Sequence, residues 1–188
     1  MKQEIETAMR QLYGDCTNTF AEDQKHFVMA RLMGLAVRND AINISNVSIL
    51  DIGGGPNSML LKCHHLKNSA VVDPIKWPLW IEDRYASKSI KLIEDKGEYI
   101  NETGYDEVWI TDTLAYANDP QRLINNAISA APRIRIFEWI NEERSDIKPN
   151  VITKNIMNQW MGMSGKTVEL SQRGCYGTAY FGVFEGWG

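Results

Sequence analysis

Short apolar runs, bounded by turn residues, recur along the chain after residue 46. Runs of three or four such residues are typical of strands buried in a parallel sheet. The predicted strands cover residues 47–50, 69–72, 90–93, 108–110 and 134–137. Apolar residues at helical spacing predict helices over residues 58–66, from Pro78, from Pro120 through Ile128, and over residues 153–161. Residues 166–170 and 179–185 predict a closing antiparallel pair.

Strands that alternate with helices predict an α/β fold: a Rossmann-like, doubly wound sheet of about seven strands. The sheet is expected to be mostly parallel with a C-terminal antiparallel strand, to follow N-terminal helices, and to bind its ligand at the carboxyl ends of the strands. Helical spacing over residues 5–12 predicts a first helix, and Thr19 with Glu22 fits a capping box that opens a second, closed by Asn39 and Asp40. We expect one domain over residues 1–188, with a helical cap or lid over 1–46 and a Rossmann-like core over 47–188.

Composition narrows the class of protein. The chain has 188 residues, 44% of them hydrophobic and 23% charged, and a net charge of −4. No dense run of Lys or Arg favours nucleic acid, and no apolar run predicts a membrane helix. The three cysteines, Cys16, Cys63 and Cys175, form no paired motif for zinc or a disulfide framework. The interpretation is a cytoplasmic protein without a metal site; its oligomeric state stays open, with a homodimer among the alternatives.

A glycine-rich turn carries the strongest signal for a ligand. Gly53, Gly54 and Gly55 follow a predicted strand and precede a predicted helix. Glycine lets the backbone turn tightly and approach a ligand without a Cβ in the way. Ser58 occupies a third small position, where a helix packs closely on the sheet. Such a turn also occurs without any ligand, but its setting between strand and helix is that of a nucleotide-binding turn.

The charge of Asp51 helps to decide between two candidate cofactors, a dinucleotide and S-adenosylmethionine. A dinucleotide would place its pyrophosphate over this turn, and the Asp51 carboxylate would repel it. S-adenosylmethionine carries an ammonium, a sulfonium and only one carboxylate, so an acidic residue beside it is tolerable. The sign of the charge therefore favours S-adenosylmethionine.

Two further acids follow the next two predicted strands. Asp73 ends the second strand, where a carboxylate can accept both ribose hydroxyls, and Glu98 follows the third strand, where it can meet the adenine amino group. Taken alone, Asp73 before Pro74 also fits a simple turn, and Glu98 also fits a solvated surface charge. The order and spacing of these acids together carry the interpretation.

The segments ILDIGGGPNS, AVVDP, KGEYI, YDEVWITDTLAYANDPQRLINNA and RIRIFEWI resemble, in this order, the motifs of class I S-adenosylmethionine-dependent methyltransferases. They are similar in particular to the small bacterial and phage members of the methyltransferase-11/12-like group, over roughly residues 47–162. The resemblance implies that the glycine turn lines the methionine part, that Asp73 binds the ribose, and that the end of the fourth strand lies beside the sulfonium. The cofactor-binding residues predicted on these grounds are Asp51, Gly53, Gly54, Gly55, Asp73, Pro74, Glu98, Tyr99, Asp112 and Thr113.

The methyl acceptor should enter above the strand ends, near Asp112, Tyr116, Glu138 and Asn141. Asp112 and Tyr116 are the predicted catalytic residues, although packing beside Leu114 and Ala115 explains Tyr116 equally well. The group that the chain resembles commonly has a histidine at the Tyr116 position and a His-Pro-His-x-x-Thr pattern where residues 148–153 stand here. The sequence lacks those histidines, and His26, His64 and His65 are interpreted as mostly structural.

The resulting hypothesis is methyl transfer from S-adenosylmethionine, with S-adenosylhomocysteine as product, to a small-molecule or glycan-like acceptor. Six tryptophans are compatible with a pocket for a planar or sugar ligand, and also with core packing. Two alternatives stay open: a catalytically silent accessory protein that binds the cofactor, and an NAD-dependent oxidoreductase, against which Asp51 argues.

Overall fold

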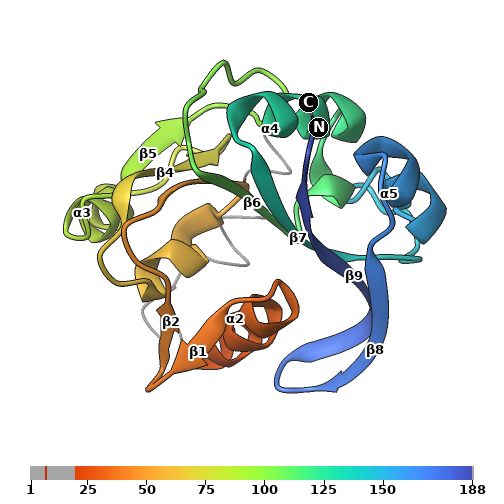
Figure 1. Cartoon of the computed structure of the whole chain (residues 1–188), viewed down its shortest axis with the longest axis horizontal. Coiled ribbons are helices and arrows are strands. Elements are labelled where there is room, and N and C mark those ends of the chain that lie inside the picture. Colours follow the sequence, from red (N-terminus) through yellow and green to blue (C-terminus); the bar gives the residue numbers. More distant parts are fainter. Residues whose placement is uncertain (1–6, 8–19, 188) are drawn as a thin grey trace.

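The computed structural model describes residue 7 and residues 20–187, and is built around a single large sheet (Figure 1). Its seven strands have the order β5-β4-β3-β6-β7-β9-β8. They are β3 (Ser48–Ile52), β4 (Lys67–Asp73), β5 (Lys91–Glu94), β6 (Glu107–Thr111), β7 (Arg133–Trp139), β8 (Lys166–Gln172) and β9 (Cys175–Glu185). The first five are parallel, whereas β9 is antiparallel to both β7 and β8. The predicted sheet is therefore confirmed.

Apolar side chains cover both faces of the sheet. On one face, α4 (Pro120–Ala130) and α5 (Lys154–Met161) pack against alternate residues of the central strands, such as Leu50 and Ile110. On the other face, α2 (Phe20–Leu32) and α3 (Leu79–Ala86) pack against the intervening residues, such as Ile49 and Trp109. Figure 1 shows α2 on the side of the sheet away from α4 and α5. This arrangement leaves the carboxyl ends of the parallel strands as the edge where a ligand can bind.

The helices after β6 and β7 begin where the sequence predicts. The Asp119 side chain accepts a hydrogen bond from the Arg122 amide, at 3.0 Å, and so caps the start of α4. Thr153 caps α5 in the same way through the Ile156 amide, at 3.3 Å. Helix α3 follows Pro78, as expected.

The helix predicted up to Asn39 and Asp40 ends earlier, because Gly34 stops it. Gly34 has φ +77°, and the amides of Gly34 and Leu35 donate to the carbonyls of Arg31 and Ala30. This is the Schellman pattern that terminates a helix. The chain then forms a hairpin of β1 (Ala36–Arg38) and β2 (Ala41–Asn43), whose two turn residues, at positions 39 and 40, both have positive φ. The prediction that this helix continues to Asn39 and Asp40 was therefore wrong. The helix predicted over residues 5–12 falls outside the part of the chain that the structure describes.

The helix predicted over residues 58–66 is also wrong. Two short 3₁₀ turns, η1 (Gly55–Asn57) and η2 (Met59–Lys62), take its place. The Ser58 hydroxyl accepts the Leu60 amide at 3.0 Å, and Cys63 already bridges to Ile42, so the chain turns directly toward β4. His64 and His65 are exposed in this connection and lie on no helix.

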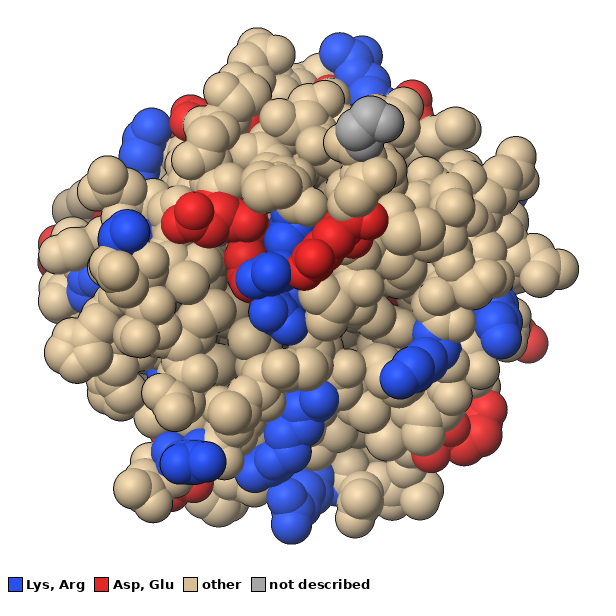
Figure 2. All heavy atoms as spheres, viewed as in Figure 1, with Lys and Arg blue, Asp and Glu red and all other residues tan. Residues whose placement is uncertain are grey.

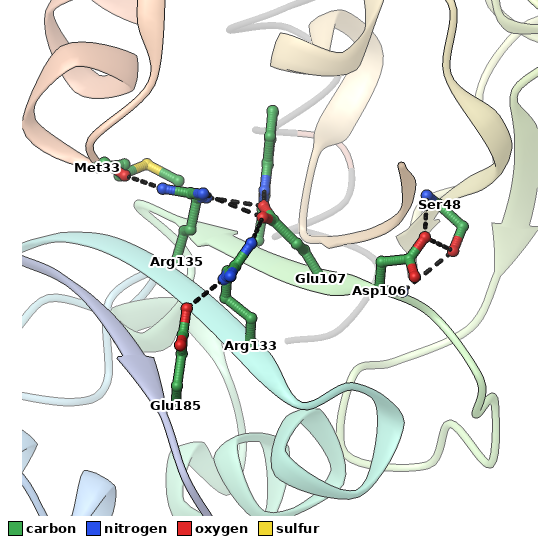
Figure 3. A network of polar contacts seen from close by, with 8 residues as sticks. Met33, Ser48, Asp106, Glu107, Arg133, Arg135 and Glu185 are labelled. Carbon is green, nitrogen blue, oxygen red and sulfur yellow. Dashed lines mark hydrogen bonds and ion pairs between the residues drawn. The ribbon is translucent and has the colours of Figure 1, made fainter. Parts of the chain in front are cut away.

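A buried ion network joins the amino-terminal halves of β6 and β7 to the end of α2 (Figure 3). Glu107 accepts hydrogen bonds from Arg135, at 2.7 and 3.0 Å, from Arg133, at 2.8 Å, and from the Trp109 indole, at 2.9 Å. Arg135 also donates to the Met33 carbonyl, at 2.6 Å. Burial alone would raise the pKa of Glu107, but these hydrogen bonds outweigh it and hold the pKa below its ordinary value.

Charges of both signs are interspersed on the face in Figure 2, where acidic groups flank basic ones near the centre. Further basic side chains lie below the centre of this face, toward its lower rim. Within the described part of the chain, no helix combines the length and the apolar character needed to cross a bilayer.

Replacing Arg135 with methionine is expected to lower the free energy of unfolding by about 3 kcal/mol, because Glu107 loses its main partner while buried. Arg133 is 42% exposed, so Arg133→Met should cost less than about 1 kcal/mol. Urea denaturation of both variants checks the difference. Equal losses of unfolding free energy in the two variants would show that Arg135 is not the main partner of Glu107.

Candidate functional site

A cavity of about 250 Å³ opens at the carboxyl ends of the parallel strands. Four segments at the carboxyl ends of the strands line it, together with residues of α2 and one residue of α4. The segments are residues 52–57, at the end of β3; residues 72–75, at the end of β4, with Trp77; residues 96–98, after β5; and residues 111–113 and 116–118, at the end of β6. Leu123 is the residue from α4. Helix α2 contributes Glu22, Lys25, His26 and Met29.

The glycine turn is built on a close contact between the ends of β3 and β6. Gly53 has φ +76°, and a Cβ placed on it would lie 2.4 Å from the Thr113 side chain. The Thr113 hydroxyl donates to carbonyls at the ends of both strands, Thr111 at 2.8 Å and Ile52 at 3.2 Å. This position therefore requires glycine, because the backbone has a positive φ and there is no room for a side chain beside Thr113.

Asp51 does not line the cavity. It is fully buried behind Gly54, whose Cβ, if present, would lie 2.5 Å from the Asp51 carboxylate. Asp51 Oδ2 accepts a short hydrogen bond from the Ser58 hydroxyl, while Oδ1 has no hydrogen-bond partner. Burial raises the pKa of Asp51 to about 7. The predicted direct effect of this charge on the ligand is therefore replaced by a structural contact that holds the turn.

Asp73 faces the cavity but already holds three donors. Its Oδ1 accepts from the Ile75 amide, at 2.9 Å, and from the Trp77 indole, at 3.1 Å, and its Oδ2 accepts from the Gly55 amide, at 3.1 Å. Burial raises the pKa of Asp73 to about 6, although these hydrogen bonds oppose the shift. A carboxylate offers about four acceptor sites, so roughly one is left, on Oδ2, for a ligand hydroxyl.

The remaining predicted residues divide between the cavity and the surface. Pro74 and Glu98 line the cavity, and Glu98 accepts the Asn118 amide, at 2.6 Å, just before α4. Tyr99 is 51% exposed, stacks under the Arg122 guanidinium and lies outside the cavity lining. Asn141 is exposed and also lies outside it.

The turn after β6 brings Asp112, Thr113 and Tyr116 to one side of the cavity. Asp112 adopts φ +50°, and its Oδ1 is buried without a hydrogen-bond partner. The Tyr116 ring lies 5.1 Å from the Lys148 ammonium. Asp112 thus combines a place in the cavity lining with one enclosed oxygen that has no hydrogen-bond partner among the described residues.

The sequence predicted a helical cap or lid over residues 1–46 but named no site residue on α2. Lys25 lies 3.5 Å from Asp112, and His26 lies 3.8 Å from Glu22 with its Nδ1 buried and without a hydrogen-bond partner. Burial, with the nearby Lys62 and Lys25 ammonium groups, lowers the pKa of His26 well below its ordinary value. His26 is thus a neutral imidazole at the cavity wall. Helical spacing alone gives no signal that this turn of α2 would reach the strand ends.

Acidic groups outnumber basic ones around the cavity. Among the described residues, four carboxyl groups line it, those of Glu22, Asp73, Glu98 and Asp112, against two lysines, Lys25 and Lys96. A pyrophosphate would also need the amino-terminal end of a helix after the glycine turn, and a three-residue 3₁₀ turn stands there. Both features disfavour a dinucleotide and suit a ligand with positive charge.

No protein-family model matches the sequence, and no curated protein matches it. Solved structures do share its fold. A putative methyltransferase from Haloferax volcanii, in complex with the Trm112 activator, has a TM-score of 0.68 at 11% identity, over 95% of this chain and 96% of that chain. Magnesium protoporphyrin IX methyltransferase from Synechocystis PCC 6803, solved with bound S-adenosylmethionine, has a TM-score of 0.65 at 16% identity, over 94% and 89%.

The fold is that of class I S-adenosylmethionine-dependent methyltransferases. The [4+2]-cyclase SpnF has it too, with a TM-score of 0.57 at 12% identity, over 78% of this chain and 58% of that chain. Membership of the methyltransferase-11/12-like group stays a prediction, as do the roles of the individual site residues. Because one fold serves more than one kind of chemistry, function has to be argued from the cavity.

Asp51→Asn is expected to flatten the dependence of stability on pH. An acid whose pKa is raised on folding binds more protons folded than unfolded, so the free energy of unfolding falls as pH rises between about 4 and 7. An asparagine side chain cannot take up this proton. The change in the free energy of unfolding with pH should therefore be smaller in Asp51→Asn, by up to about 1.4 kcal/mol per pH unit. Urea denaturation at several pH values measures it, with exposed Asp83→Asn as the control, and equal slopes in both variants would contradict the shift.

Proposed function

We propose that the chain binds S-adenosylmethionine in this cavity and transfers its methyl group to a small-molecule or glycan-like acceptor. The observation that carries the proposal is the cavity itself: the glycine turn, Asp73 and Asp112 line one space at the strand ends. The solved neighbours with this fold, one of them with S-adenosylmethionine bound, support it.

The charges of the cavity suit the two ends of this cofactor. At the end beside β6, the negative charge of Asp112 suits an ammonium, and Lys25, at 3.5 Å from Asp112, suits a carboxylate. At the other end, the remaining acceptor site of Asp73 suits a ribose hydroxyl. The apolar side chains of Ile75 and Leu123 line the walls, where the flat adenine ring would lie.

The cofactor supplies an activated methyl group when bound, so the protein has to orient the acceptor and remove a proton from it. Tyr116 and Asp112 flank the space in which an acceptor would sit. His26 lines the same cavity with an unpartnered Nδ1 and a neutral ring. We propose that His26 accepts the proton that the methyl acceptor loses. His26 would then replace the histidines that are common in the methyltransferase-11/12-like group and absent here.

A second candidate is a protein that keeps the fold and binds the cofactor without transferring its methyl group. The fold of the cyclase SpnF and the tyrosine at position 116 favour it. Formation of S-adenosylhomocysteine, measured over a panel of small-molecule and sugar acceptors, separates the two candidates. Tight binding with no product across the panel would support the second and contradict the first.

Calorimetric titration tests the cofactor. S-adenosylmethionine is expected to bind and NAD is not, because the cavity is acidic and a 3₁₀ turn, in place of a helix, follows the glycine turn. Asp73→Asn should weaken binding by about tenfold to a hundredfold, since a hydrogen bond to a charged group contributes about 1.5–3 kcal/mol.

Asp83→Asn, at an exposed position of α3, is the matched control and should bind like the wild type. Asp73 also holds the turn through Gly55, so thermal denaturation must first show that Asp73→Asn is folded. Binding of NAD in place of S-adenosylmethionine would overturn the proposal.

A further inference from the structure

A second carboxyl group lies directly behind Asp112. Glu138, near the end of β7, is completely buried, and its Oε2 accepts the amides of Thr113, at 2.9 Å, and Leu114, at 2.7 Å. Those two residues follow Asp112 in the chain, and the Asp112 amide donates to the carbonyl of Phe137, beside Glu138. The turn after β6 and the end of β7 thus place the two side chains together.

Each of these carboxyl groups has one oxygen that makes no hydrogen bond. Asp112 Oδ1 and Glu138 Oε1 are both buried and unpartnered. Two ionised carboxylates at one buried place repel each other, and a lone buried charge is costly. Burial raises the pKa of Glu138 to about 8, and the negative charge of Asp112 contributes to the rise.

The surrounding charges do not neutralise a doubly ionised pair. Lys25 lies on the cavity side, 3.5 Å from Asp112, but is also 4.0 Å from Glu22, which is 38% exposed. Lys148 faces the pair from the loop after β7, but its ammonium lies 2.6 Å from the Glu142 carboxylate. Glu22 and Glu142 are both partly exposed, at 38% and 41%, and with both counted four acids stand against two lysines among the described residues.

Only one member of the pair can meet a ligand. Asp112 lines the cavity, whereas Glu138 does not. A cation that enters beside Asp112 would stabilise the ionised form of both carboxyl groups, and would therefore compete with the proton. Glu138 then acts on the ligand through Asp112, as a positioning and proton-holding residue.

We propose that Asp112 and Glu138 hold one proton between them in the ligand-free protein, and release it when a cationic group binds beside Asp112. In the proton-loaded state the Asp112–Glu138 pair is singly charged; after release it is doubly charged and paired with the cation. The identity of that cation, the ammonium or sulfonium of S-adenosylmethionine, rests on the proposed function. The inference that the pair holds a proton does not depend on the proposed function.

Calorimetric titration with S-adenosylmethionine in buffers of different ionisation enthalpy counts the protons released. The wild type should release up to about one proton at pH 7, and its affinity should rise with pH, by at most about tenfold per unit, until the pair is ionised near pH 8. Glu138→Gln should release almost none and bind with little dependence on pH. Glu143→Gln, an exposed neighbour in the chain, is the control and should behave like the wild type.

Binding by the wild type without proton release would overturn the proposal. Should S-adenosylmethionine fail to bind at all, the proposed function fails, and the pair is tested in the ligand-free protein by carbon-13 carboxyl NMR. One carboxyl group of the wild type should titrate near pH 8 and be missing from the Glu138→Gln spectrum. If both carboxyl groups are already ionised at about pH 6, the proton-holding pair is excluded.

Discussion

The cavity depends on the parallel pairing of β3 with β4 and β6, which sends the chain out of all three strands at the same edge. Ile52, at the end of β3, pairs in register with Val72 of β4 and Ile110 of β6. The glycine turn, Asp73 and Asp112 follow those three residues almost immediately, so they meet although they are far apart in the sequence. The close approach of Gly53 to Thr113 then fixes how near the first and third of these segments lie.

The strands were predictable because a strand buried on both faces is a continuous apolar run, and each run here is flanked by turn residues. The two wrong helices arose where apolar spacing does not distinguish structures. Met59 and Leu60 are core residues that pack from a 3₁₀ turn, and no periodicity in so short a segment reveals that. At positions 39 and 40, two polar residues that fit a helix end also fit a hairpin turn, and Gly34 was the available signal for the earlier stop.

The sequence predicted which motifs form the site and in what order they occur along the chain. It did not predict the contacts that their side chains make. The sequence places Asp73 and Asp112 at strand ends, and the structure brings both to one cavity. The burial of Asp51 behind Gly54, the donors already held by Asp73, and the place of Glu138 behind Asp112 depend on how the turns fold and pack. Spacing along the chain does not give these contacts, so the charge state of each acid could not be inferred from it.

Helix α2 is part of the wall of the cavity and part of the core at once. Met29 lines the cavity, while Phe27, Ala30 and Met33 are buried against the sheet, and Arg135 holds the Met33 carbonyl. Swinging α2 outward would bring these apolar side chains into water, at about 1.5–3 kcal/mol for each large one. The core therefore holds the α2 wall in place, so that a ligand in the cavity meets Met29 at a position already set by folding.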